Sequence, residues 1–373
     1  MKVEDFLRIL DAEFYTGVPD SQLKALCDYL CDNYGTSSQK HVLAANEGNA
    51  VGIAAGYYLA NKMPAVVYMQ NSGEGNIVNP AASLLNKKVY GIPVIFVVGW
   101  RGEPGVHDEP QHIFQGEITL KLLELLGISY TVISKESSTE DIEREMHTFR
   151  EALGKGESVA FVIKKGALTY DRNKKYGNEY SMTREEVIRH IIAVSGDDPI
   201  ISTTGKASRE LFELREANDS GHGRDFLTVG SMGHCSSIAM GIALNKPDKR
   251  IWCIDGDGAS LMHMGALSVM ASVRPDNLIH IVINNGAHET VGGQHTALRE
   301  RNISAIAKES GYPYAVTVED YDSLDMELGK ARDRNGLCLI EVKCALGARD
   351  DLGRPTTTAE ENKEAFMEFL NDK

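Results

Sequence analysis

Residues 251–267 read IWCIDGDGASLMHMGAL, an apolar run that ends in two aspartates interleaved with two glycines. The run from Ile251 to Ile254 is typical of a buried strand, which favours a parallel sheet covered on both faces. Carboxylates directly after such a strand do not pack in a core, and glycine costs stability where backbone freedom is not needed. The stretch is therefore either an ordinary tight turn or a place where an acid is held for chemistry.

Apolar strand-like runs alternate with helical patterns on both sides of this stretch. In the first half we expect strands at 41–45, 65–69 and 92–99, and helices at 3–10, 50–60 and 77–88, the last interrupted by Pro80, with a glycine turn over 71–76. In the second half we expect strands at 199–205, 226–233, 250–258, 278–286 and 337–343, and a helix over 260–272. The alternation predicts an α/β fold with two doubly wound parallel-sheet domains. We assign them to residues 1–165 and 183–373, joined by a polar linker over 166–182.

Composition limits the classes of function. The 373 residues carry a net charge of −14, and the sequence has no long basic block, so we expect neither nucleic acid nor an anionic membrane as a partner. The six cysteines form no CxxC pair, and residues 1–13 have no signal-peptide pattern. The longest apolar run, IPVIFVV, is too short to span a bilayer. These observations predict a cytoplasmic protein.

The acids after Ile254 have polar counterparts further along the chain. Asp257 and Gly258 are followed by residues 259–283 and then by Asn284 and Asn285, which close the next expected strand. In a βαβ unit these strand ends can lie side by side, which brings carboxylate and amide oxygens within reach of one cation such as Mg²⁺. Gly258 also allows backbone N–H groups at a helix start to face a phosphate. The twelfth residue counted from Asp255 is not an acid, which excludes an EF-hand, and the GxGxxG fingerprint is absent here.

The GDG motif, the spacer of about 25 residues and the NN pair resemble the cofactor-binding motif of the thiamine diphosphate-dependent decarboxylase family. The resemblance implies a thiamine diphosphate-binding fold without the middle domain of larger members, and a bound Mg²⁺ that clamps the diphosphate. It implies that the metal ligands are Asp257, Asn285 and the carbonyl of Ala287. The resemblance also implies cofactor contacts from the GDG and NN motifs, from the STTG and GSMG turns, and from a methionine that packs against the cofactor. The implied contact residues are Glu47, Thr203, Thr204, Gly205, Gly230, Met232, Asp257, Gly258, Ala259 and Asn285.

The segment VLAANEGNAVGIAAGYYLA resembles the catalytic-glutamate segment of the same family. Glu47 follows an expected strand and precedes a helix rich in Ala and Gly. The resemblance implies that it lies beside the cofactor's aminopyrimidine and promotes the tautomer that acts as base. A carboxyl in this role needs an apolar setting that raises its pKa toward neutrality. The opposite interpretation is a glutamate that merely favours a helix N-terminus.

Because only a short linker joins the two expected domains, the chain resembles the compact branch of the family, whose members decarboxylate phosphonopyruvate or sulfopyruvate. Further matching segments are TGVPDS, QNSGEGN, GSMGH, NNGAHETVGGQ and the loop GWRGEPGVHDEPQH. The resemblance implies decarboxylation of 3-phosphonopyruvate to phosphonoacetaldehyde and CO₂, a step of phosphonate biosynthesis. We expect substrate contacts from Ser21, Arg101, Asp108 and Gln111 and a proton shuttle from His107 or His112. Where some pyruvate decarboxylases have a catalytic Glu six residues after the second Asn, this chain has Val291, and whether Glu289 substitutes is open.

Three alternatives stay open at this point. They are a sulfopyruvate decarboxylase, a carboligase of the acetolactate synthase type, which the missing middle domain disfavours, and a non-catalytic cofactor-binding subunit. The family resemblance also implies a homo-oligomer, at least a dimer, in which Glu47 of one chain faces Asp257 of another. The expected partner is a small anionic 2-oxo acid.

Overall fold

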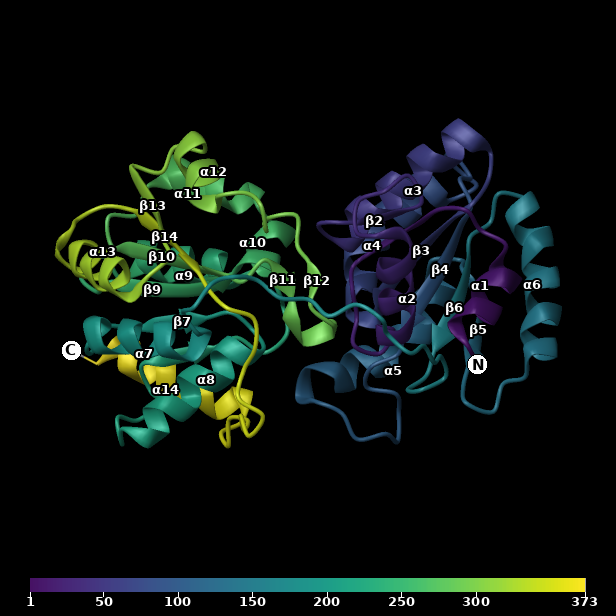
Figure 1. The fold of residues 1–373 in the computed structure, drawn as a ribbon. Helices are drawn as coiled ribbons and strands as arrows, with labels where there is room; N and C mark the ends of the chain where they lie inside the picture. Colours follow the sequence, from purple (N-terminus) through teal and green to yellow (C-terminus); the bar gives the residue numbers. More distant parts are fainter. Residues whose placement is uncertain (373) are drawn as a thin grey trace. The chain divides into compact units, whose positions relative to one another are not determined.

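The computed structural model describes residues 1–372 and divides into two compact units, one of Met1–Tyr176 and one that starts at Gly177 (Figure 1). The division falls inside the segment 166–182, which contains no helix or strand of its own. Each unit has a parallel sheet with helices on both faces. This confirms the expected fold class of two doubly wound parallel-sheet domains with no middle domain.

The sheet of the first unit has six parallel strands in the order β2-β1-β3-β4-β6-β5. Their bounds are β1 (Tyr15–Gly17), β2 (His41–Leu43), β3 (Ala65–Gln70), β4 (Val94–Gly99), β5 (Ser129–Ile133) and β6 (Val159–Ile163). The chain runs from β1 outward to β2 and then crosses to β3 on the other side of β1. Ligands in such sheets bind where the strand order reverses, beyond the carboxyl ends of the strands.

Helices cover both faces of this sheet because alternate strand residues point to opposite sides. The helical elements are α1 (Val3–Leu10), α2 (Lys24–Tyr34), α3 (Glu47–Asn61), η1 (Asn71–Gly73), α4 (Glu74–Pro80), η2 (Ala81–Leu85), α5 (Pro110–Leu125) and α6 (Thr139–Gly154). On β4, Ile95 and Val97 pack in the core with α1, α2 and α6, whereas Phe96 and Val98 pack in the core with α3, α4 and α5. The double burial explains why β4 is an uninterrupted apolar run.

The second unit repeats the architecture with the strand order β13-β14-β10-β9-β7-β8. Its elements also include the antiparallel pair β11 and β12. The strands are β7 (Ile200–Ser202), β8 (Asp225–Leu227), β9 (Ile251–Gly256), β10 (Leu278–Asn284), β11 (Ala287–His288), β12 (Gln294–His295), β13 (Tyr314–Val318) and β14 (Cys338–Lys343). The helical elements are α7 (Arg184–Ser195), α8 (Lys206–Ala217), α9 (Cys235–Asn245), α10 (Asp257–Met262), α11 (Gly265–Val273), η3 (Glu289–Val291), α12 (Ile303–Glu309), α13 (Tyr321–Asp333) and α14 (Ala359–Asn371). Here the strand order reverses between β7 and β9.

Two local predictions are wrong in detail. The helix expected over 260–272 begins at Asp257 and is broken at His263 and Met264, and α11 restarts at Gly265, a residue that weakens helices. The glycine turn expected over 71–76 is instead the short helix η1 followed by α4. The Asn71 side chain donates to the Arg101 carbonyl and to Thr119, both at 2.8 Å, so tertiary hydrogen bonds fix a helical entry that the local sequence does not encode.

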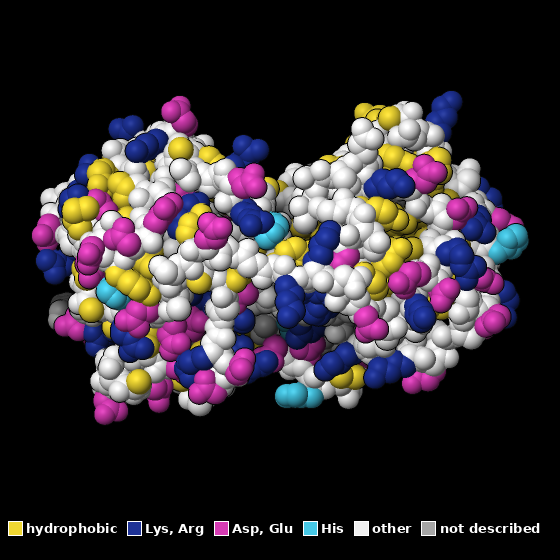
Figure 2. Space-filling view, in the orientation of Figure 1, with side chains coloured by type: hydrophobic (Ala, Val, Ile, Leu, Met, Phe, Trp, Pro, Cys, Tyr) yellow, Lys and Arg dark blue, Asp and Glu magenta, His cyan; other side chains and the backbone are white. Residues whose placement is uncertain are grey.

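The surface and the cysteines agree with an ordinary globular protein. All six cysteines are buried, and none of them forms a disulfide. Acidic and basic side chains are interspersed over the face drawn in Figure 2. Among the helices that lie within residues 1–372, none has the length and apolar character needed to cross a membrane.

Candidate active site

In the second unit the predicted cofactor residues lie where the strand order reverses. Ser202 at the end of β7 pairs with Ile254 of β9, and the Thr203 N–H donates to the Ile254 carbonyl at 2.8 Å. Thr203, Thr204 and Gly205 therefore begin beside the strand that leads to Asp257. Gly205 has φ +96, which favours glycine, and a Cβ built there would have no described atom within 4 Å. The start of α8 thus opens onto free space, the arrangement in which helix N–H groups bind phosphate.

The GDG and NN motifs come together at neighbouring strand ends. Gly256 pairs with Ile283, so Asp257 and Asn285 emerge from adjacent positions at the same edge of the sheet. Both are buried, with 3% of Asp257 and 9% of Asn285 exposed. Thr296 donates to Asp257 Oδ2 at 2.6 Å, but burial outweighs this hydrogen bond and raises the pKa of the Asp257 carboxyl to about 6. Asn285 Oδ1 accepts from the Ala287 N–H at 3.0 Å, and this hydrogen bond forms a tight turn that keeps Ala287 close to the Asn285 side chain.

The donor set fits Mg²⁺ better than a transition metal. Within residues 1–372 no cluster of three His, Cys, Asp or Glu side chains is arranged to hold an ion. A carboxylate, an amide oxygen and a backbone carbonyl are hard ligands, and such a set usually fills its coordination shell with water and substrate phosphates. The residues present are therefore compatible with a diphosphate-bound Mg²⁺.

Met232 and Gly258 lie against each other, which was not evident from the sequence. A Cβ built on Gly258 would lie 3.4 Å from Met232 Cε and 3.5 Å from His288 Nδ1. Met232 is 38% exposed, so it is not an ordinary core methionine. The turn that presents it contains Gly230 at φ +70, Ser231 at φ +45 and Gly233 at φ +89, and Gly230 N–H donates to Thr204 Oγ1 at 3.0 Å. The turn thus joins Gly230 to Thr204 and places Met232 against Gly258.

Glu289 is an ion-paired carboxylate. It accepts from Arg184 at 2.9 Å, Lys206 at 2.5 Å and Asn285 Nδ2 at 2.9 Å. Burial acts to raise the pKa of Glu289, but Arg184 and Lys206 outweigh it and hold the pKa below its ordinary value. A carboxylate held ionised in this way is a poor proton donor, which argues against Glu289 as the substitute for the acid missing at Val291.

In the first unit Glu47 has the opposite environment. It is the first residue of α3, after the N-cap Asn46, whose side chain accepts from the Asn49 N–H at 2.9 Å. Only 4% of Glu47 is exposed, and burial raises its pKa despite one hydrogen bond of 2.6 Å from Asn76. A Cβ built on Gly73 would lie 2.5 Å from the Glu47 carboxyl carbon, so only glycine there leaves room for this side chain. The setting therefore favours the neutral form of the carboxyl more than water does.

Four of the predicted substrate-loop residues surround one cavity of about 260 Å³, namely Ser21, Arg101, His107 and Asp108. Asp20 Oδ2 accepts from the N–H groups of Gln22 and Leu23 at 3.1 and 3.2 Å, which forms the turn that carries Ser21. Arg101, the predicted phosphonate anchor, already has side-chain partners. Its guanidinium pairs in bidentate fashion with Asp108 and donates to Ser21 Oγ at 3.0 Å, which leaves one N–H on each terminal nitrogen.

Gln111 and His112 are not among the residues that line this cavity. Both lie in the first turn of α5. His112 is largely buried, and burial together with the nearby Arg101 charge lowers its pKa to about 4. Near pH 7 it is a neutral imidazole, which leaves His107 as the better placed of the two predicted proton shuttles.

Several residues of the site were not predicted from the sequence. They are Gly73, Asn76, Lys165, Arg184, Lys206, His288 and Thr296. Gly73 and Asn76 belong to the quoted segment QNSGEGN, and His288 lies between Ala287 and Glu289, so proximity to a motif was a usable signal for these three. Arg184 and Lys206 are the first residues of α7 and α8, and nothing in their local sequence announces a distant carboxylate.

Comparisons with known proteins identify the family. Residues 3–124 match the model of the thiamine pyrophosphate enzyme N-terminal TPP binding domain, and residues 203–342 match that of the C-terminal TPP binding domain. The chain is 31% identical to a phosphonopyruvate decarboxylase of Streptomyces viridochromogenes, over 95% of this chain and 90% of the relative. It is 30% identical to a phosphonopyruvate decarboxylase of Streptomyces hygroscopicus with the same coverage, and 26% identical to a sulfopyruvate decarboxylase of Methanosarcina acetivorans over 100% and 97%. Thiamine pyrophosphate and thiamine diphosphate are two names for one cofactor, and the chain belongs to the thiamine pyrophosphate enzyme family.

Proposed function

We propose that this protein catalyses the thiamine diphosphate- and Mg²⁺-dependent decarboxylation of 3-phosphonopyruvate to phosphonoacetaldehyde and CO₂. The observation that carries the proposal is the 31% identity to a phosphonopyruvate decarboxylase over 95% of the chain, with both cofactor-binding domains matched. The sulfopyruvate decarboxylase relative, at 26% identity, makes a sulfonate head group the second candidate. Both candidates are 2-oxo acid decarboxylases with an anionic head.

The predicted site residues of the second unit have binding roles in this proposal. Asp257, Asn285 and the Ala287 carbonyl would hold Mg²⁺, and the Thr203–Gly205 turn with the N–H groups of Gly258 and Ala259 would bind the diphosphate. Met232 would pack against the cofactor, and the Gly230 carbonyl would accept a hydrogen bond from its aminopyrimidine. When bound, thiamine diphosphate supplies the nucleophilic carbon and the electron sink for loss of CO₂.

Glu47 has the proton-handling role. Burial raises the pKa of Glu47, which favours the protonated carboxyl that would donate a hydrogen bond to the cofactor's pyrimidine nitrogen. Gly73 and Asn76 keep the carboxyl in place. His107, at the cavity of Ser21 and Arg101, is the group we assign to proton delivery onto the product.

The charges around the cavity support an anionic head group. Arg101 is balanced by Asp108, and Lys164 is balanced by Glu103. Lys165 also lines the cavity, and no residue in 1–372 pairs with it. An anion that enters therefore meets one uncompensated ammonium and the two remaining N–H groups of Arg101, which suits a phosphonate or sulfonate better than the methyl group of pyruvate.

The test is initial aldehyde formation from phosphonopyruvate, sulfopyruvate and pyruvate, each with and without thiamine diphosphate and Mg²⁺. We expect a cofactor-dependent rate with the largest kcat/KM for phosphonopyruvate. In Lys165→Met, KM for the two substrates with anionic heads should rise about tenfold, as expected for one lost charged contact, while pyruvate serves as the internal control. A preference for sulfopyruvate would change the assigned substrate to sulfopyruvate. Cofactor binding without any turnover would favour a non-catalytic cofactor-binding subunit.

The proposal includes a homo-oligomer, at least a dimer, with Glu47 of one chain facing Asp257 of another. Mixing two inactive variants, Glu47→Gln and Asp257→Ala, tests this arrangement. If sites are shared between chains, the mixed oligomer contains sites with neither substitution and activity returns. No recovery after verified subunit exchange would place both residues of a site on one chain.

A further inference from the structure

Glu289 joins the two loops that carry the predicted metal and diphosphate contacts. Its Oε2 accepts from Asn285 Nδ2 and from Arg184, both at 2.9 Å, and its Oε1 accepts from Lys206 at 2.5 Å. Asn285 closes β10, whereas Lys206 opens α8 directly after the Thr203–Gly205 turn. The side chain is only 11% exposed, so these contacts are shielded from solvent. One carboxylate thus connects the end of β10 with the start of α8.

The contact with Glu289 decides which way the Asn285 amide faces. A carboxylate without a proton only accepts hydrogen bonds, so Asn285 must present its NH₂ to Glu289. The amide oxygen then faces the opposite way, where it already accepts from the Ala287 N–H at 3.0 Å. If the amide were flipped, its oxygen would face the Glu289 carboxylate and both contacts would be lost. The hydrogen bond to Glu289 therefore turns the Asn285 amide oxygen away from Glu289, which leaves this oxygen available to a metal.

We propose that Glu289 is a positioning residue that orients the Asn285 amide oxygen toward the metal and fixes the β10 loop against the start of α8. The proposal rests on the proposed function, since Asn285 is a metal ligand only if the site holds Mg²⁺. Partners of this kind, one shell outside a metal, typically change metal affinity about 10- to 100-fold when they are removed. The role differs from that of the acid expected at Val291, because both Glu289 oxygens are already occupied by protein donors.

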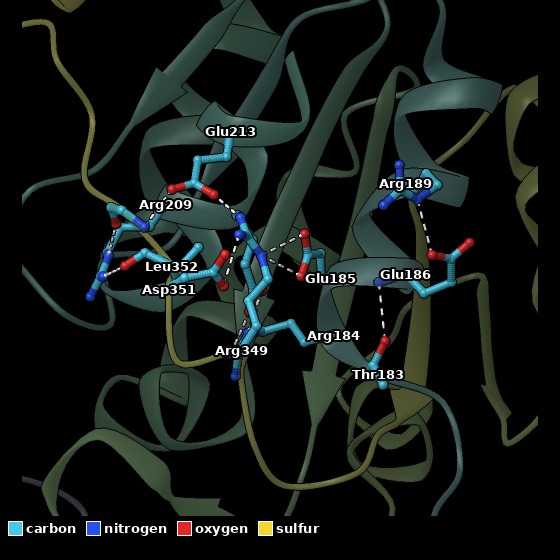
Figure 3. Close-up of polar contacts among 12 residues, drawn as sticks. Thr183, Arg184, Glu185, Glu186, Arg189, Arg209, Glu213, Arg349, Asp351 and Leu352 are labelled. Atoms are coloured by element: carbon cyan, nitrogen blue, oxygen red, sulfur yellow. Dashed lines mark hydrogen bonds and ion pairs between the residues drawn. The ribbon is translucent and has the colours of Figure 1, made fainter. Parts of the chain in front are cut away.

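The framework behind Glu289 is itself buried and anchored. Arg184, at the start of α7, also binds Glu210 of α8 at 2.7 and 2.8 Å, and these two side chains are 9% and 1% exposed. Figure 3 shows a separate ion-pair group nearby, in which Arg349 contacts Glu185, Glu213 and Asp351. This second group ties the segment before α14 to α7 and α8 but has no bond to Asn285. It supplies a matched control for loss of an acid at the same helices.

The experiment compares two charge-balanced variants, Lys206→Met/Glu289→Met and Lys206→Met/Glu289→Gln. Both remove one cation and one anion, but only Gln keeps an oxygen that can accept from Asn285. Mn²⁺ affinity is measured by electron paramagnetic resonance in the presence of thiamine diphosphate, with Lys206→Met as the reference and Glu185→Gln as the control. We expect Mn²⁺ binding to weaken about 10- to 100-fold in the Met variant and to stay within a few-fold of the reference in the Gln variant and the control.

Equal Mn²⁺ affinities in the Met and Gln variants would overturn the proposal, because the acceptor would then have no role. Should the Met variant not fold, Asn285→Asp asks the same question. Aspartate is the stronger Mg²⁺ ligand in isolation, but beside Glu289 it has no N–H to donate and adds a like charge. We expect weaker Mn²⁺ binding in Asn285→Asp, and equal or tighter binding contradicts the positioning role. Since metal binding is the readout, failure of phosphonopyruvate turnover alone would count against the proposed function and not against this inference.

Discussion

Glu47 and Glu289 are both shielded carboxyls in predicted cofactor loops, and their surroundings differ in kind. Glu47 packs on Gly73 and has one amide partner, Asn76, and burial raises its pKa. Glu289 meets Arg184, Lys206 and Asn285, and the two cations lower its pKa despite burial. The same side chain is therefore shifted toward its neutral form in the first unit and toward its ionised form in the second. The neighbours, and not the residue type, assign the role of a carboxyl.

The largest expected effect is loss of turnover in Glu47→Gln. The amide keeps the shape but cannot exchange the proton, and loss of a positioned acid–base group typically lowers rates about 10²- to 10⁴-fold. We expect kcat to fall by this range in steady-state assays, while thiamine diphosphate and Mg²⁺ still bind by calorimetry. A fully active Glu47→Gln variant would contradict the proposal that Glu47 handles a proton during turnover.

The next effect is on stability, in Arg184→Met. The substitution leaves Glu210 and Glu289 without their shared cation, and breaking a buried pair costs about 3–5 kcal/mol. We expect a loss of this size in urea-induced unfolding. Arg189→Met is the control, because Arg189 is exposed on the same helix and pairs with Glu186 at 3.0 Å (Figure 3). Equal losses in both variants would show that the buried ion pairs of Arg184 stabilise the protein no more than the exposed pair of Arg189.

Glu74 extends the comparison to a buried carboxyl for which residues 1–372 supply no hydrogen-bond partner. It is 0% exposed, neither oxygen has a hydrogen-bond partner within the described residues, and burial raises its pKa to about 8. The folded protein then binds more protons than the unfolded chain from about pH 4.5 to about pH 8, so stability falls as pH rises through this window.

Glu74→Gln removes that pH-dependent cost. We expect it to match the wild type at pH 5 and to be more stable by roughly 2–4 kcal/mol at pH 9, since water entry and relaxation reduce the full linkage value. Thermal unfolding from pH 5 to pH 9 measures the difference. Parallel curves for the two proteins would mean that Glu74 does not become a buried charge.

The smallest effect is expected from Asn76→Leu. The Asn76 N–H stabilises the ionised form of Glu47, so its removal raises the pKa of that carboxyl further. One hydrogen bond is worth about 0.5–1.5 kcal/mol, which corresponds to a shift of no more than about one pH unit. Because the form of Glu47 that acts carries the proton, the alkaline limb of kcat/KM against pH should move upward by that amount. A downward move would contradict the assigned direction.

The sequence predicted the parts of the molecule that depend on short-range patterns. The apolar runs of β4, β9 and β10 announce a doubly covered parallel sheet, and their ends locate Asp257 and Asn285. β5 and β13 were not predicted, because strands with partly exposed residues lack a continuous apolar run. The 71–76 segment was predicted as a turn from its glycines, whereas contacts of Asn71 with Arg101 and Thr119 make its entry helical.

The roles of charged residues were harder to predict because their partners are distant in the chain. Glu289 lies 105 residues from Arg184 and 83 from Lys206, and no local pattern connects them. Arg101 could be placed on a strand-end loop, but its engagement with Asp108 and Ser21 depends on how the loop closes. Motif spacing therefore located the loops, and only the fold revealed which charges are neutralised.

The most direct test of this division of labour is hydrogen–deuterium exchange at the thiazolium carbon of bound thiamine diphosphate, followed by NMR at saturating Mg²⁺. It compares the wild type with Glu47→Gln and with Lys206→Met/Glu289→Gln. We predict that exchange slows at least about 100-fold in Glu47→Gln and stays within a few-fold of the wild type in the Glu289 variant. Comparable slowing in both variants, or none in Glu47→Gln, would contradict the claim that Glu47 exchanges the proton while Glu289 only positions.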